Sequence, residues 1–229
     1  MQNLKKYSLL FFFFIFFSIS TFAHFGSKGP YGGTVTCSIV YDTTVYLGTA
    51  EGGVYESTTS KLVAWRPRPV GLKSGKITAL AHSGKYLFAG TADSGVYIFN
   101  GYSGSDRYWQ QINNGIGTYE ILSLIALDST TLLAGTNGGG VYKTTNKGAS
   151  WDLMNNTDLN GNYITGFAKG DNYIFLLAGG GPYISSDNGQ TWTLFNDLNT
   201  SGVYGATSLS YNSITHELML SCPEGMFRA

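Results

Sequence analysis

The chain has 229 residues, of which 12% are charged, and its 14 basic side chains balance its 14 acidic ones. A neutral chain lacks the basic surface that nucleic acids and anionic membranes attract, so both are excluded as partners. The 31 glycines, 16 tyrosines and 14 phenylalanines are unlike the composition of a helical protein and favour β-structure.

The first 23 residues have the pattern of a secretory signal peptide. Lys5 and Lys6 precede an uninterrupted apolar run over 9–17, and small residues lead up to a cleavage site after Ala23. The alternative is an uncleaved membrane anchor, but the apolar run is shorter than the ~20 residues of a membrane-spanning helix. The sequence therefore predicts a secreted or periplasmic protein without stable membrane insertion after cleavage, in which 24–33 is a linker.

A repeat dominates the remaining chain. The stretches LGTAEGGVY (47–55), AGTADSGVY (89–97) and AGTNGGGVY (134–142) are copies of one segment, and weaker copies start at 177 and 220. The aromatic residue that ends each copy recurs at intervals of 42, 45, 41 and 44 residues, and the tryptophans recur at intervals of 44, 42 and 41. The aromatic residues are Tyr55, Tyr97, Tyr142, Tyr183 and Phe227, and the tryptophans are Trp65, Trp109, Trp151 and Trp192.

Each repeat unit contains four short runs of β-forming residues separated by turn residues. In the third unit these runs are YEILSLIA, TLLAGT, VYKT and WDLM. Four strands in a unit of about 40–45 residues are the signature of an all-β propeller built from four-stranded antiparallel blades. We expect the blades at about 34–70, 76–114, 119–157, 162–198 and 203–229.

The fifth unit is expected to be partial. The tryptophan interval places its outer strand beyond Ala229, which predicts four full blades and a partial fifth in an incomplete ring. The alternative is a closed five-bladed ring in which 24–33 pairs with the strand at 225–228. The glycines and the proline of HFGSKGPYGG make a poor strand, which disfavours this closure.

The segment SSDNGQTW at 185–192 carries a motif that is partly repeated as TTNKGASW at 144–151. It resembles the Asp-box, S-x-D-x-G-x-T-W, of BNR-repeat propellers of the sortilin, sialidase and photosystem II assembly-factor types, and of xyloglucan-cleaving hydrolases. The matching residues are Ser185, Asp187, Gly189, Thr191 and Trp192, and Thr144, Asn146, Gly148, Ser150 and Trp151. The resemblance implies a position between the third and fourth strands of a blade, on the face away from the ligand site.

The chemistry of the box indicates a folding device. An Asp or Asn side chain accepts hydrogen bonds from backbone N–H groups just ahead of it and closes a turn. Glycine takes the positive φ of a tight hairpin, and tryptophan begins the outer strand and packs on a neighbouring strand or blade. Both segments are therefore assigned structural roles.

Candidate ligand-binding residues lie in the turn between the second and third strands, with Glu51, Asp93 and Asn137 in successive units. In propellers this turn opens on the face that bears the central funnel, where the three side chains would form a polar arc. The alternative is that they are ordinary hairpin residues.

Signals for catalysis, metals and cofactors are weak. A sialidase needs three arginines around a carboxylate, and the arginines at 66, 68, 107 and 228 do not form such a cluster in the sequence. Catalytic carboxyls cannot be paired from the sequence alone, and the three histidines lack ligand spacing, so we assign no catalytic residue, metal or cofactor. Cys37 and Cys222 either form one disulfide or remain two separate thiols.

The leading functional interpretation is an exported, non-enzymatic propeller that binds a protein or glycan partner through its funnel face. One alternative is a glycoside hydrolase or sialidase-like enzyme. The other is a partial gene product without independent activity.

Overall fold

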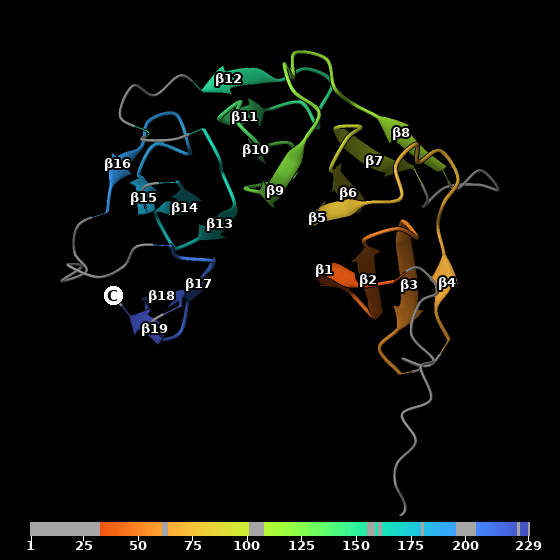
Figure 1. Cartoon of the computed structure of the whole chain (residues 1–229), viewed down its shortest axis with the longest axis horizontal. Helices are drawn as coiled ribbons and strands as arrows, with labels where there is room; N and C mark the ends of the chain where they lie inside the picture. Colours follow the sequence, from red (N-terminus) through yellow and green to blue (C-terminus); the bar gives the residue numbers. More distant parts are fainter. Residues whose placement is uncertain are drawn as a thin grey trace, which may run out of the picture.

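Figure 1 shows the computed structural model of the chain, which describes residues 33–60, 64–100, 108–154, 159, 162–179, 181–195, 205–223 and 225–228. The predicted signal peptide and the linker up to residue 32 lie outside these residues. The described residues form nineteen strands and no helix, so this part of the chain offers no helix that could cross a membrane.

The strands form five antiparallel sheets, in each of which a strand pairs with its neighbours in the chain. The first sheet contains β1 (Val35–Tyr41), β2 (Thr44–Thr49), β3 (Val54–Thr58) and β4 (Arg66–Pro67), and the second β5 (Ile77–Ser83), β6 (Tyr86–Thr91), β7 (Val96–Asn100) and β8 (Tyr108–Gln111). The third contains β9 (Ile121–Ala126), β10 (Leu132–Thr136), β11 (Val141–Thr144) and β12 (Asp152–Met154), and the fourth β13 (Gly166–Lys169), β14 (Ile174–Ala178), β15 (Gly181–Ser185) and β16 (Thr193–Leu194). The fifth contains β17 (Ser208–Asn212), β18 (Glu217–Cys222) and β19 (Gly225–Arg228).

The five sheets follow one another around a central axis, with the first strand of each sheet innermost (Figure 1). β1 lies beside β5, β5 beside β9, β9 beside β13 and β13 beside β17. This confirms the predicted all-β propeller of antiparallel blades. The fifth unit is a blade in its own right, because its strands pair regularly and bury Leu220 and Cys222 against Leu177 of the fourth sheet. It has three strands among the described residues, and the count of four full blades plus a partial fifth is corrected to five blades.

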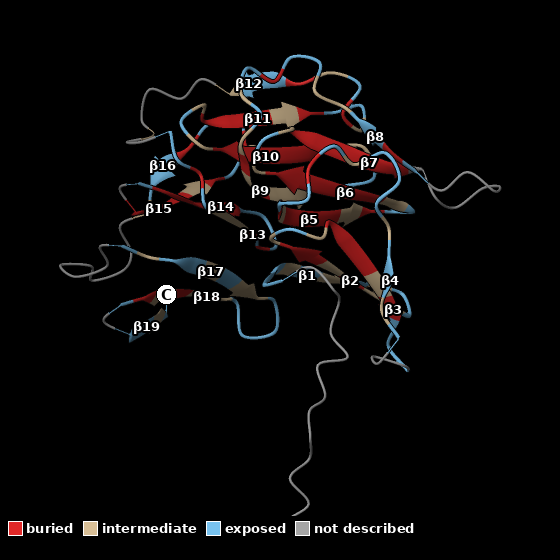
Figure 2. Ribbon diagram, turned by 45° about the vertical axis from the view of Figure 1, so that its right-hand side comes forward, coloured by how far each residue is buried: buried red, intermediate tan, exposed pale blue. Residues whose placement is uncertain are grey.

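The central strands of the blades carry the core, and the outer strands face solvent. Figure 2 shows β6, β7, β10 and β14 buried over most of their length and β12 and β16 largely exposed. The tryptophan rings that precede or begin the outer strands are buried, with Trp109, Trp151 and Trp192 at most 3% exposed. Nε1 of Trp109 donates to the Arg68 carbonyl at 2.9 Å and Nε1 of Trp151 to the Ile112 carbonyl at 2.8 Å, which ties each outer strand to the preceding blade.

Neighbouring blades interlock through a glycine on the second strand of one blade and an isoleucine of the next. The pairs are Gly48 with Ile77, Gly90 with Ile121, and Gly135 with Ile164. The three isoleucines are fully buried, and a Cβ at any of these glycines would lie within 2.7 Å of the isoleucine Cγ2. Between the fourth and fifth blades the large and the small side chain change places. Leu177 occupies the position of the glycine, and Ala206 occupies the position of the isoleucine. Every joint thus pairs one large side chain with one small one.

The segment 185–192 forms the turn between β15 and β16. The Asp187 carboxylate accepts hydrogen bonds from the N–H and the hydroxyl of Thr191, at 2.9 and 2.6 Å. The Ser185 hydroxyl donates to Asp187 at 2.8 Å and accepts the N–H of Gly189 at 2.9 Å. Partial burial alone would raise the pKa of Asp187, but the hydrogen bonds outweigh it and lower this pKa to about 2.

The segment 144–151 forms the same turn between β11 and β12, with an amide in place of the carboxylate. Asn146 Oδ1 accepts the Ser150 N–H at 2.9 Å and the Thr144 hydroxyl at 2.8 Å. The N–H of Gly148 donates to the Thr144 hydroxyl at 2.9 Å. These three bonds are therefore shared by both turns, whereas Asn146 Nδ2 donates to the Ser150 hydroxyl at the place where Asp187 accepts the Thr191 hydroxyl.

Cys37 in β1 and Cys222 in β18 form no disulfide with each other, so of the two alternatives the structure supports two separate thiols. Burial raises the pKa of the Cys37 thiol, which keeps it protonated at neutral pH.

Candidate functional site

Three turns at one end of the sheets share one hydrogen-bonded geometry. They connect β2 to β3, β6 to β7 and β10 to β11, and in each a buried threonine hydroxyl donates to the carbonyl of the glycine four residues ahead, at 2.9, 2.8 and 2.7 Å. The pairs are Thr49 with Gly53, Thr91 with Gly95, and Thr136 with Gly140. In the first two turns the hydroxyl also accepts a backbone N–H at 3.0 Å. The threonine fixes each turn in the same shape and thereby holds its side chains in place.

Two of the three predicted ligand-binding residues occupy equivalent places in these turns. Glu51 and Asp93 are both exposed. Asn137 is partly buried, and its N–H donates to the Glu120 carbonyl at 3.0 Å. In the first two blades the equivalent bond is made by Ala50 and Ala92, the residues directly before Glu51 and Asp93. Asn137 therefore lies one position earlier, and Gly138 stands where the other two turns carry an acidic side chain.

Each turn is also bonded to the segment that leads into the next blade. The backbone N–H groups of Gly53, Gly95 and Gly140 donate to the carbonyls of Gly75, Tyr119 and Asn162, at 2.9, 2.8 and 3.2 Å. These bonds bring Tyr119 and Tyr163, which are 53% and 56% exposed, to the same end of the sheets as the acidic side chains. We refer to this end as the turn face and define it by Glu51, Lys76, Asp93, Tyr119, Glu120 and Tyr163.

The turn face combines hydrogen-bond acceptors, one ammonium group and two exposed aromatic rings. Carboxylates accept hydrogen bonds from ligand N–H and O–H groups, and a tyrosine ring offers an apolar face beside a polar hydroxyl. Such a surface suits reversible binding of an amphipathic ligand.

Sequence reasoning missed the tyrosines of the turn face. Each lies one or two residues before a buried isoleucine that opens the next blade, in YEI (119–121) and NYI (162–164). The signal that could have found them is the isoleucine itself. When the units are aligned on it, Lys76, Glu120 and Tyr163 occupy the position directly before it, and Tyr119 occupies the position before that.

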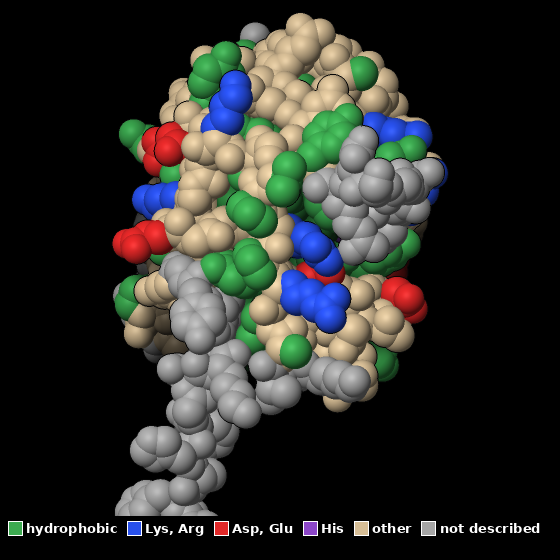
Figure 3. Space-filling view, turned by 90° about the vertical axis from the view of Figure 1, so that its right-hand side faces the viewer, with side chains coloured by type: hydrophobic (Ala, Val, Ile, Leu, Met, Phe, Trp, Pro, Cys, Tyr) green, Lys and Arg blue, Asp and Glu red, His purple; other side chains and the backbone are tan. Residues whose placement is uncertain are grey.

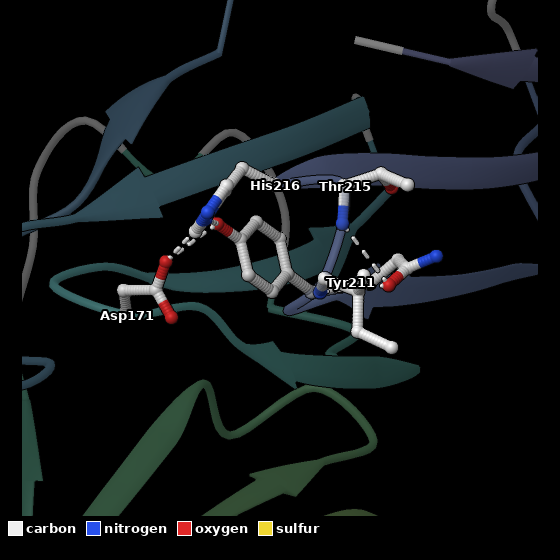
Figure 4. Close-up of polar contacts among 6 residues, drawn as sticks. Asp171, Tyr211, Thr215 and His216 are labelled. Carbon is white, nitrogen blue, oxygen red and sulfur yellow. Dashed lines mark hydrogen bonds and ion pairs between the residues drawn. The ribbon is translucent and has the colours of Figure 1, made fainter.

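The opposite end of the sheets carries a polar cluster between the fourth and fifth blades (Figure 4). Nδ1 of His216, in the β17–β18 turn, lies 2.6 Å from Oδ2 of Asp171, in the β13–β14 turn. The Tyr211 hydroxyl donates to the same oxygen at 3.2 Å. Desolvation and the Asp171 charge raise the pKa of Tyr211, so its hydroxyl remains a donor at neutral pH. The cluster links the two blades.

Basic side chains also lie on the side of the molecule. Arg68 forms an ion pair with Glu56, and the two side chains are 20% and 15% exposed. Figure 3, which faces this side, shows Lys and Arg side chains next to an acidic one. Because Glu56 already balances its charge within the first blade, Arg68 is poorly suited to clamp a substrate carboxylate. In the described part of the chain, no three His, Cys, Asp or Glu side chains are grouped so as to hold a metal ion.

No protein-family model matches the sequence, and no curated protein matches it. Solved structures do match the fold. The extracellular domain of the putative hybrid two-component system BT4673 from B. thetaiotaomicron gives a TM-score of 0.68 at 14% identity, over 88% of this chain and 27% of that chain. YCF48 bound to the D1 peptide gives 0.63 at 14% identity, over 86% of this chain and 65% of that chain. An ancestral GH74 enzyme gives 0.61 at 14% identity, over 86% of this chain and 36% of that chain.

This chain spans less than two thirds of the length of each of these three proteins. At such low identity the likeness concerns the fold, and a shared fold does not carry a shared ligand. The five sheets and the solved structures together establish this chain as a β-propeller.

Proposed function

We propose that the chain is an exported propeller of the Asp-box type that acts as a non-enzymatic binding module for a protein or glycan partner. The turn face is the binding surface. The observation that carries the proposal is the set of three threonine-locked turns, which place the exposed carboxylates of Glu51 and Asp93 at the same end of the sheets as the exposed rings of Tyr119 and Tyr163.

Preorganisation is the physical reason for the proposal. A surface whose backbone is already fixed loses little conformational entropy when it binds, so modest contacts give useful affinity. The buried threonines and the inter-blade backbone bonds supply this fixation without using the exposed side chains.

Two similar structures support the partner class and the location. One is an extracellular domain, which agrees with the signal-peptide pattern of the first 23 residues. Another was solved with a bound peptide, which agrees with a protein partner. The similar GH74 enzyme supports the alternative of a glycoside hydrolase, which would need two carboxyl groups facing each other across one cleft.

The proposal is tested by screening the purified chain from residue 24 onward against arrays of peptides and glycans. For a ligand found in this way, we expect the double variants Glu51→Gln/Asp93→Asn and Tyr119→Ala/Tyr163→Ala to bind at least tenfold more weakly, by calorimetry. The matched control is Tyr108→Ala on the outer strand β8, where the ring is 41% exposed. Equal affinity in both double variants and in the parent would refute the turn face as the binding surface.

A further inference from the structure

A pocket with a volume of ≈ 350 Å³ lies between the third and fourth blades, at the end of the sheets opposite the turn face. Three turns build its walls: the one that follows β9, the one between β13 and β14, and the one that follows β15. The side chains that matter for the argument are Asp128, Lys169, Asp171, Asn172, Tyr173 and Asn188. Its size is at the lower end of small-molecule sites, which run from about 300 to 1,000 Å³.

Both carboxylates of the pocket are held in place by their own partners. Oδ1 of Asp128 accepts the N–H groups of Thr130 and Thr131, each at 2.8 Å, and the Thr130 hydroxyl at 3.0 Å. These bonds, led by the Thr130 N–H, lower the pKa of Asp128 to about 2, so the group is ionised at neutral pH. Asp171 is held by Oδ2, through Tyr211 and His216 of the fifth blade. Among the described hydrogen bonds, none uses the second oxygen of either carboxylate.

Lysine side chains cross-link the two blades around the pocket. Lys169 of the fourth blade donates to the Leu127 carbonyl of the third at 2.6 Å, and Lys143 of the third donates to the Asn188 carbonyl of the fourth at 2.9 Å. An ammonium group has three N–H donors, so one bond leaves Lys169 able to donate to a ligand. The pocket is therefore preformed and carries donors as well as acceptors.

An exposed aromatic ring stands at the edge of the pocket. Tyr173 is 47% exposed, and its ring lies 6.5 Å from that of Phe175. Phe175 in turn stacks on Tyr211 at 5.9 Å. Phe175 therefore packs beside Tyr173 at a tilt of 51°, and about half of the Tyr173 surface is accessible to a ligand.

We propose that this pocket binds a neutral sugar unit of a glycan. Sugar hydroxyls both donate and accept hydrogen bonds, and the pocket offers carboxylates as acceptors with an ammonium and two amides as donors. A sugar ring also has an apolar face that can pack on the exposed part of the Tyr173 side chain. Two carboxylates beside one ammonium disfavour an anion, and the ammonium disfavours a simple cation. The site is separate from the turn face and stands independently of the function proposed for it.

The test uses the chain from residue 24 onward and a panel of neutral hexoses, N-acetylhexosamines and their trisaccharides, with binding followed by saturation-transfer NMR and calorimetry. We expect at least one trisaccharide to bind, with affinity at least tenfold lower in Tyr173→Ala and in Asp171→Asn. Tyr173→Phe keeps the ring and should keep most of the affinity. Tyr211→Phe removes only one bond to Asp171 and should lose at most a few-fold.

The turn-face variant Tyr119→Ala/Tyr163→Ala serves as the matched control and should bind the same sugar as the parent does. Binding of no sugar in the panel would overturn the proposal. Binding that is lost in the turn-face variant and retained in Tyr173→Ala would also overturn it, because the sugar would then belong to the turn face. Circular dichroism and thermal unfolding establish that each variant is folded, and Tyr173 is exposed enough for its truncation to leave the core intact.

Discussion

At the scale of single residues, the segments 144–151 and 185–192 show how one side chain closes a turn. Both segments could be predicted from sequence as turns, because the hydrogen bonds of Asp187 and Asn146 run to residues three or four positions ahead. The tyrosines of the turn face could not be predicted in the same way. Their placement depends on bonds between blades, such as that from the Gly95 N–H to the Tyr119 carbonyl.

Replacing Asp187 by Ala should lower the free energy of unfolding by about 1–2 kcal/mol, because it leaves the turn N–H groups without their acceptor. Asp187→Asn should cost less, since Asn146 performs the same role in the third blade. Urea denaturation followed by tryptophan fluorescence measures both values. A loss as large in Asp187→Asn as in Asp187→Ala would mean that the negative charge, and not the acceptor geometry, holds the turn.

Acid should weaken the fold in a specific pH window. The pKa values of Asp128 and Asp187 are lowered to about 2 in the folded chain, whereas an unfolded aspartate has a pKa of about 3.9. Such groups stabilise the fold fully above the unfolded pKa, and this stabilisation is lost as the pH falls toward 2. We expect the unfolding temperature to drop between about pH 4 and pH 2, and to drop less in Asp187→Asn. An equal drop in that variant would assign the acid sensitivity to other groups.

At the scale of elements, the strands follow from local patterns and the joints between blades do not. From the sequence, the glycine of each LGT or AGT segment looks like an ordinary strand residue. Its role is to make room for an isoleucine about thirty residues later in the chain, as Gly90 does for Ile121, and this contact is visible only in the structure. The exchange of sizes between Leu177 and Ala206 is invisible for the same reason. The register within a turn is also hard to predict. The sequence aligns Asn137 with Glu51 and Asp93 because all three are polar, but the backbone hydrogen bonds show that Gly138 is the equivalent residue.

Gly90→Ala should destabilise the fold by about 1–3 kcal/mol, because the added methyl would lie 2.7 Å from the Ile121 side chain. The double variant Gly90→Ala/Ile121→Val should recover part of the loss relative to the sum of its single variants. Gly179→Ala is the control, since a Cβ there meets nothing within 4 Å. Strict additivity of the two changes in urea denaturation would contradict direct contact at this joint.

At the scale of the whole molecule, the two end blades are less covered than the middle ones. Val35 of β1 has the register position of Ile77 and Ile121, yet it is 46% exposed where they are fully buried. The strands of the fifth sheet are likewise more exposed than β10 and β14. The uneven burial follows from the packing of the described strands, in which β1 contacts β5 of the second sheet and β17 contacts β13 of the fourth, so that each end sheet packs on one neighbour.

Hydrogen exchange should therefore be fastest at the ends of the blade series. A repeat that packs on one side opens at a lower free energy than one that packs on both, so its amides are less protected. We expect amides of β1 and of β17–β19 to exchange well before those of β6 and β10, whose side chains are almost entirely buried. Mass spectrometry of peptides covering these strands measures the order.

Asp171→Asn, which weakens the link between the fourth and fifth blades, should speed exchange in β17–β19 and leave β1 unchanged. Equal protection of β1 and β10 would mean that the exposed face of the first blade is covered in solution.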